Sequence, residues 1–405
     1  MSHYSTTRRK VLKATGGLAA FGVASTAGCL GGNSYAIGMA NPVSGSLDTF
    51  GQRNQRGKEL AVADVNDVGL RGGELEIIEE DTKSVEQDGI SAAQKLVNQD
   101  GVPVVIGAVG SAVSLAIYES VIQDTDVEQI SQNSTSPGLS EHPELMRMSP
   151  PGKAQAGAIA DLVEGDDHGS VAVAYVNNAY GQGVAEVFRE SFDGEVAYFE
   201  AHNQGESSYS NVVTGMDEAG ADAWVFVTYQ PEFTTMATEA FNQGVTDVPL
   251  YGADSVKGPD VLEQAPEDFL EGMKAVIPSA ALTQDNYQEF ASTFEEEFDQ
   301  EPTAWATYAY DGIVTAAIAA HAADDFSTDG ITTELVKDVT SPEGETVYSY
   351  EAAHEILEDG GSASDVNYEG ISGPIDLDEN GDPRAFLQVM QVQDGAYEQI
   401  DTIAG

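Results

Sequence analysis

The sequence has few residues of two kinds, and each shortage excludes a class of protein. Cys29 is the only cysteine in 405 residues, so no disulfide can form within the chain. Lys and Arg total 17 against 68 Asp and Glu, which gives a formal net charge of −51. Nucleic acids and anionic membrane surfaces bind to basic faces. This chain lacks the charge for one, so neither is expected as a partner of the folded part.

Signatures of catalysis are also missing. The sequence contains no G-x-S-x-G elbow, no H-E-x-x-H motif, no pair of metal-binding cysteines and no P-loop. Gly181-Gln-Gly183 lacks the third glycine of a dinucleotide loop. Residues 376–381 imitate the first half of an EF-hand, but Leu387 at its twelfth position cannot supply a carboxylate, so a tight turn is the better interpretation. We therefore expect no catalytic residue, metal or cofactor, and no enzyme. The histidines are scattered singly and are expected at the surface or away from any site: His3, His142, His168, His202, His321 and His354.

The N-terminal segment is typical of an exported protein. Arg8 and Arg9 stand in a basic stretch, and the apolar residues 14–27 after it are too few for a membrane span of ~20 residues. Residues 1–28 are thus predicted to be a twin-arginine signal peptide. Cys29 follows small residues and precedes a glycine-containing tether that ends at residue 34, which favours a lipid-acceptor cysteine over a simple spacer.

The excess of acidic residues indicates the kind of solvent to which the folded chain is adapted. After residue 28, 13 Lys and Arg face 68 Asp and Glu, yet 41% of the whole chain is hydrophobic, which is enough for a core. A solvated acidic shell on a folded body indicates a halophilic protein, because salt screens its self-repulsion. The fold is expected to loosen at low salt.

Short β-type runs alternate with helical stretches, which predicts an α/β fold with mostly parallel sheets. Expected strands cover residues 36–40, 75–79, 102–106 and 127–131, then 170–175, 195–199, 223–227 and 248–251. Expected helices cover residues 55–66, 90–98 and 112–123, then 181–190, 209–219 and 233–243. A helical tail from 284 to 323 carries Phe290, Phe294 and Phe298, expected in the core. A polar stretch 324–369 then leads to a predicted hairpin of 373–377 with 386–391.

About 370 residues exceed one ordinary domain, so two doubly wound lobes are expected. Several loops that follow strands are suited to hold an anion, because backbone N–H groups point outward there. In an α/β sheet these loops lie at the carboxyl ends of the strands, where ligands bind. They are 41–45, 107–111 and 132–137 in the first series, and 180–181, 229–232 and 252–255 in the second.

The motifs in these loops resemble those of solute-binding proteins of branched-chain amino acid ABC transporters, over residues 36–393. Asn41-Pro-Val-Ser-Gly-Ser-Leu-Asp-Thr-Phe-Gly51 is similar to the family's G-P-x-S-G-x-x-A-x-x-G, with departures at Asn41 and Asp48. Ile130-Ser-Gln-Asn-Ser-Thr-Ser-Pro137 is similar to I-S-P-x-A-T-x-P, with departures at Gln132 and Ser134. Residues 105–111 and Asn177-Asn-Ala-Tyr-Gly-Gln-Gly183 resemble two further family segments. Their order and spacing make the match specific.

The resemblance implies a type I periplasmic binding fold, in which two lobes joined by three crossings close on a ligand. It places residues 35–149 and 280–345 in lobe 1, and 150–279 and 346–405 in lobe 2. The crossings are expected near 149–152, near 275–279 and within 344–373. Lobe closure would complete the ligand contacts and present the closed form to a membrane permease with a separate ATPase.

The resemblance also implies ligand contacts. Ser111 and Thr135 would bind the ligand carboxylate, helped by the backbone at Asn133 and Ser134. Asp254 would pair with the α-ammonium, which complements a zwitterion. The aromatic positions expected to wall the ligand side chain are Phe50, Tyr180, Tyr229 and Tyr308. The alternatives are helix N-capping for the two hydroxyls, core packing for the aromatics, and membership of the acidic shell for Asp254.

The implied function is a lipid-anchored protein on the outer face of the cell membrane that delivers an amino acid, expected to be branched-chain, to an ABC permease. Relatives with this scaffold bind urea, short amides or aromatic acids, and an amide would not need Asp254. A ligand-sensing receptor component is another alternative, although a sensor is expected to carry a signalling segment as well.

Overall fold

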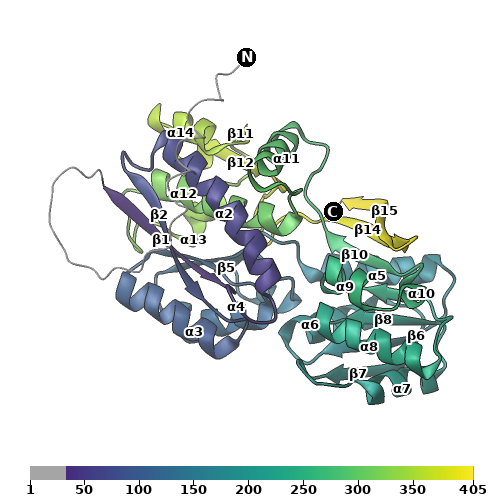
Figure 1. Ribbon diagram of the computed structural model, residues 1–405. Helices are drawn as coiled ribbons and strands as arrows, with labels where there is room; N and C mark the ends of the chain where they lie inside the picture. Colours follow the sequence, from purple (N-terminus) through teal and green to yellow (C-terminus); the bar gives the residue numbers. More distant parts are fainter. Residues whose placement is uncertain (1–32, 405) are drawn as a thin grey trace. The chain divides into compact units, whose positions relative to one another are not determined.

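The computed structural model describes residues 33–404 and contains two large sheets (Figure 1). The first sheet is entirely parallel, with the order β2-β1-β3-β4-β5. Its strands are β1 (Ser34–Asn41), β2 (Glu74–Asp81), β3 (Val104–Gly107), β4 (Glu128–Ser131) and β5 (Leu145–Arg147). The helical segments between them are α2 (Asp48–Val68), α3 (Glu86–Lys95) with η2 (Leu96–Asp100), α4 (Ser111–Ile117) with η3 (Tyr118–Ile122), and η4 (Pro137–Glu141). This alternation confirms the α/β prediction.

The second sheet has seven strands in the order β15-β14-β10-β9-β8-β6-β7, and strand β14 runs antiparallel to both of its neighbours, β10 and β15. Its strands are β6 (Ser170–Val176), β7 (Glu195–His202), β8 (Ala223–Val227), β9 (Leu250–Gly252), β10 (Lys274–Pro278), β14 (Phe386–Gln393) and β15 (Ala396–Ala404). Its helices are α5 (Gly152–Gly165), α6 (Ala179–Ser191), α7 (Ser210–Ala219), α8 (Gln230–Gln243), η5 (Asp254–Val256), α9 (Pro259–Gln264) and α10 (Glu267–Leu270).

The remaining elements pack on the first sheet. They are α11 (Asp285–Phe298), α12 (Ala304–Ala322), α13 (Thr333–Asp338), α14 (Tyr350–Glu358), η6 (Ala363–Asp365) and a small sheet of β11 (Glu345–Val347), β12 (Val366–Gly370) and β13 (Gly373–Pro374). Helix α12 is buried along most of its length, because its surface is apolar all round. It packs closely on α2 at Gly57, where a Cβ would lie 2.1 Å from Ala306 O. Phe290 and Phe294 are buried in the same core, as expected.

The segment 346–375 packs differently from the division expected from the sequence. Val347, Tyr350, Val366 and Tyr368 belong to the core of the first sheet, not the second. They lie there because the apolar faces of the small sheet and α14 cover α12. The third passage between the lobes therefore lies between 375 and 387, later than the expected range of 344–373. The elements of the first sheet and those packed on it thus lie within residues 34–147 and 285–375, and the strands and helices of the second sheet lie within residues 152–278 and 386–404.

The predicted C-terminal hairpin is wrong in its pairing. Strand β14 pairs with β15, from Phe386 with Ala404 to Gln393 with Ala396, at the edge of the second sheet (Figure 1). The expected partner, 373–377, instead supplies β13, which pairs with β12 in the small sheet. The two segments were expected to pair because both are apolar and turn residues separate them. In the structure residues 375–385 instead form the passage between the lobes. Segments 373–377 and 386–391 therefore lie in different sheets.

Candidate functional site

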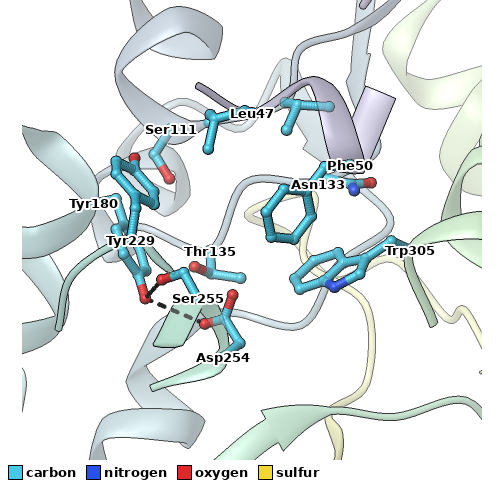
Figure 2. Close-up of a pocket in the computed structure, with 12 residues that line it drawn as sticks. Leu47, Phe50, Ser111, Asn133, Thr135, Tyr180, Tyr229, Asp254, Ser255 and Trp305 are labelled. Atoms are coloured by element: carbon cyan, nitrogen blue, oxygen red, sulfur yellow. Dashed lines mark hydrogen bonds between the residues drawn. The ribbon is translucent and has the colours of Figure 1, made fainter. Parts of the chain in front are cut away.

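A pocket lies between the two lobes, with about 340 Å³ of space not filled by atoms, part of it open to solvent. The first lobe lines it with Leu47, Phe50, Val109, Gly110, Ser111, Asn133, Thr135 and Trp305. The second lobe lines it with Tyr180, Tyr229, Asp254 and Ser255. Figure 2 shows the rings of Phe50 and Trp305 on the side of this space opposite Ser111, Tyr180 and Tyr229. A ligand here would touch both lobes.

Two adjacent strand ends supply the hydroxyl groups. Ser111 begins α4 a few residues after β3, and Thr135 lies in the loop after β4. The loops are tied together, since the Gly110 N–H donates to Asn133 O at 3.0 Å and the Ser136 N–H donates to Ser111 Oγ at 3.0 Å. Because Ser111 Oγ already accepts a hydrogen bond, its own proton remains available to a ligand oxygen.

Arg147 fixes the Thr135 loop from behind. Its side chain is fully buried, and Nη1 donates to the carbonyl oxygens of Ser134 and Ser136 at 3.2 and 2.8 Å. Its Nε donates to Asp382 Oδ1 at 2.6 Å, in the third passage between the lobes. The two carbonyls on either side of Thr135 are thus held, which leaves the threonine side chain facing the pocket (Figure 2).

The start of α5 also packs on this loop. The Gly152 N–H donates to Thr135 O at 2.6 Å, and a Cβ at Gly152 would lie 2.3 Å from that oxygen. Only glycine allows the chain to approach so closely at this point. The first passage between the lobes is therefore in direct contact with the pocket wall.

Asp254 is the acid of the pocket and comes from η5, after β9. Its Oδ1 accepts from Gln155 Nε2 at 2.8 Å and from the Tyr180 hydroxyl at 3.3 Å. Burial raises the pKa of Asp254 to about 6, although hydrogen bonds from Gln155, from its own backbone N–H and from Tyr180 oppose that rise. No side chain of residues 33–404 donates to its Oδ2, and the Asp254 side chain points toward Thr135 in Figure 2. This oxygen is available to a cationic ligand group.

Aromatic rings form two pairs around the pocket. Phe50 and Trp305 meet edge to face with centroids 5.7 Å apart, and Tyr180 stacks on Tyr229 at 5.6 Å. The Tyr229 hydroxyl accepts from Asn178 Nδ2 at 3.2 Å. With Leu47, these rings give the pocket apolar walls beside its polar end.

Seven of the nine residues expected to contact a ligand line this one pocket, and two do not. Ser134 turns its Oγ to Ser114 Oγ at 2.8 Å and donates its N–H to Ser149 Oγ, so both groups are already used. Tyr308 lies behind Trp305, 5.8 Å away, and donates its hydroxyl to Ser279 O. The pocket residues that were not expected from the sequence are Leu47, Val109, Gly110, Ser255 and Trp305.

The five pocket residues that were not expected differ in how strongly sequence motifs point to them. Four of them lie within or beside the loop motifs, so the sequence predicts that these segments reach the pocket: Leu47, Val109, Gly110 and Ser255. Trp305 had no such signal, because it lies on the first turn of the buried helix α12 rather than in a loop after a strand. Only the packing of α12 brings it to Phe50.

One group of side chains outside the pocket has the composition of a metal site. His321, His354 and Glu358 place one ligand atom each within 4.8 Å of one another, so these two histidines are not isolated as expected. Helices α12 and α14 bring them together. However, the Arg71 N–H donates to His321 Nδ1 at 3.4 Å, so the ring proton resides on Nε2 and donates to Glu358 at 3.1 Å. A metal would have to displace that proton, and His354 Nε2 lies 4.0 Å from the same Glu358 oxygen.

The export and lipidation predictions, which concern residues 1–28 and Cys29, lie outside the described residues. Within residues 33–404, no helix is both long enough and apolar enough to span a bilayer.

Two lobes built on mostly parallel sheets, with a pocket at the carboxyl ends of the parallel strands, define a solute-binding protein of the cleft type. Residues 34–396 match the family described as periplasmic binding protein, and the chain belongs to that family. It is a family of binding proteins and not of enzymes.

Three known proteins show the range of this similarity. The Leu/Ile/Val-binding protein homolog 2 of Brucella abortus is 27% identical over 312 residues, which are 73% of this chain and 81% of the relative. The structure of a leucine-binding protein from Thermotoga maritima superposes with a TM-score of 0.79 at 22% identity, covering 91% of this chain and 98% of that one. A solute-binding protein of Rhodopseudomonas palustris in complex with 3,4-dihydroxybenzoic acid has a TM-score of 0.73 at 19% identity, covering 92% and 97%.

Proposed function

We propose that this protein captures an amino acid with a branched aliphatic side chain in the pocket between its lobes and delivers it to an ABC permease. The proposal includes export by the twin-arginine route and anchoring through a lipid on Cys29. It is supported by the similarity to proteins named as leucine, isoleucine and valine binders and by the chemistry of the pocket.

The observation that carries the proposal is the arrangement of charge in the pocket. The free oxygen of Asp254 lies on one side, and the hydroxyls of Ser111 and Thr135 lie in the same cavity. An α-amino acid carries an ammonium and a carboxylate on adjacent carbons, so it satisfies the acid and the hydroxyls together. Its side chain would then lie against Leu47, Phe50 and Trp305, where burying a branched aliphatic group contributes about 1.5–3 kcal/mol.

An aromatic acid is the second candidate, and the two aromatic pairs of the pocket favour it. A benzoate could stack on these rings and use the hydroxyls of Ser111 and Thr135. It would bring no cation to Asp254, whose charge would then stay buried without a partner. The pocket acid therefore favours the amino acid.

Calorimetric titration of the chain from residue 33 onward in 2 M KCl tests the choice. Leucine, isoleucine, valine, urea, acetamide and benzoate are titrated into the wild type and into Asp254→Asn. We expect binding of the branched amino acids, lost by at least about 100-fold in Asp254→Asn because a charge-assisted pair is removed. Asp260→Asn, at an exposed acid, serves as the control. Binding of benzoate alone, unchanged in Asp254→Asn, would contradict the proposal.

A further inference from the structure

The side chain of Gln155 supports the pocket acid from outside the cavity. Gln155 lies in the first turn of α5 and is 2% exposed. Its Nε2 donates to Asp254 Oδ1 at 2.8 Å and to Val276 O in β10 at 2.8 Å. Both amide hydrogens are thus used within the protein, and one of them reaches the acid.

The other end of the same amide has no partner. Gln155 Oε1 is buried, and no described residue donates to it. A buried acceptor left unpaired costs free energy, so this glutamine is not the best choice for stability alone. What the side chain supplies at this position is its NH₂ group, directed at Asp254.

The two side-chain donors to Asp254 converge on one of its oxygens. Gln155 and Tyr180 both donate to Oδ1, and neither reaches Oδ2. Tyr180 is itself engaged with the Ser255 hydroxyl, which lies beside the acid in the pocket. Rotation of the carboxylate would break the bond to Gln155, whose amide is fixed at its other hydrogen by Val276 O. The orientation of Asp254 is therefore set by the second lobe before any ligand arrives.

We propose that Gln155 is a positioning residue that makes the pocket select ligands with a cationic nitrogen, because it holds Asp254 ionised with Oδ2 toward the ligand. The inference rests on the proposed amino-acid function and adds the residue on which the preference for an ammonium depends. A ligand without that cation leaves the oriented, charged oxygen unpaired, and the site rejects it. Without the donor, burial protonates Asp254 more readily, and a neutral acid distinguishes the two kinds of ligand poorly.

The test compares leucine with 4-methylpentanoate, which is leucine without its amino group. Kd is measured for both by calorimetry at pH 7.5 in wild type, Gln155→Met and Gln155→Asn. Methionine keeps the length of the side chain without the donor, and asparagine keeps the amide but is too short to reach. Gln182→Met, at an exposed glutamine of α6, is the matched control. We expect leucine affinity to fall about 10- to 100-fold in both Gln155 variants, while 4-methylpentanoate binds at least as tightly as it does to the wild type.

A purely structural role gives a different result. If Gln155 only supports the fold, both ligands weaken by the same factor, and that outcome overturns the inference. Unchanged leucine affinity in a folded Gln155→Met overturns it as well.

A ligand-free measurement separates this inference from the proposed function. The ¹³C carboxyl resonance of Asp254, identified by its loss in Asp254→Asn, is titrated in wild type and Gln155→Met. We expect a higher pKa in Gln155→Met, because a hydrogen bond to the charged form is removed. An unchanged pKa overturns the role of Gln155. If the wild type binds no amino acid but this shift is seen, the proposed ligand fails while the positioning of Asp254 stands.

Discussion

Replacing Asp254 by asparagine should weaken amino-acid binding at least about 100-fold and yet stabilise the empty protein. Asp254 is 8% exposed, and burial raises the pKa of its carboxyl group from 3.8 to about 6. Two pKa units correspond to about 3 kcal/mol of differential stability between the two protonation states. Asparagine has no charge to desolvate, and its Oδ1 can still accept from Gln155 and Tyr180. The variant should therefore gain on the order of 2–3 kcal/mol at pH 8.

The sign of the pH dependence follows from the raised pKa. Between pH 4 and 6 the folded protein holds a proton on Asp254 that the unfolded chain has released, so the stability of the wild type falls as pH rises through this range. The penalty is complete above pH 6 and absent below about pH 4. The advantage of Asp254→Asn should accordingly be largest at pH 8 and shrink toward zero at pH 4.

Urea unfolding without ligand, in 2 M KCl at pH 4, 6 and 8, measures this advantage. Fluorescence reports on Trp224 in the second lobe and Trp305 in the pocket, and coincident transitions with circular dichroism establish two-state behaviour. Asp260→Asn is the control and should show no such trend. An Asp254→Asn variant that is less stable than wild type at pH 8, or whose advantage is the same at all three values, would refute the reasoning.

Three further outcomes are expected. Because ammonium binding needs the ionised acid, leucine affinity should be about 10-fold weaker at pH 5 than at pH 7.5 in the wild type. In Asp254→Asn the affinity should not change with pH over this range. Calorimetry at both pH values measures the affinities, and a wild-type affinity that does not depend on pH would contradict the prediction. Arg147→Met should lower the free energy of unfolding, measured with urea, by about 3–5 kcal/mol, because it leaves Asp382 and two loop carbonyls without their partner. A loss below about 1 kcal/mol would show that the ion pair is not needed. The thermal midpoint should fall between 2 M and 0.1 M KCl, because 68 acids face 17 basic residues; equal midpoints would count against a halophilic protein.

The strand-end loops could be predicted from the sequence because their position is a consequence of local pattern. Parallel strands place their carboxyl ends at one edge of the sheet, so a loop such as 132–137 must lie beside the loop 107–111 once the strands are recognised. Ser111, Thr135 and Asp254 were located by this logic together with the motifs around them, and they line the same pocket.

Other expectations failed where the outcome depends on contacts between distant segments. Tyr308 was expected at the pocket, but it lies almost one helical turn after Trp305, and α12 turns Trp305 to the cavity and Tyr308 to Ser279. The hairpin prediction failed for a similar reason. An apolar run does not specify its partner strand, and β14 pairs with β10 and β15 rather than with the expected segment 373–377.

The fold class, the family and the loops that carry the polar groups follow from the sequence, because the periodicity of apolar residues and the spacing of turn motifs are local properties. Which side chains meet depends on the tertiary structure. In the folded chain Trp305 contacts Phe50, and Gln155 and Tyr180 both donate to the same oxygen of Asp254. Residues 346–375 pack in the core of the first sheet. Such contacts join residues far apart in the chain, and packing of the completed core selects among the many pairings that each local pattern allows.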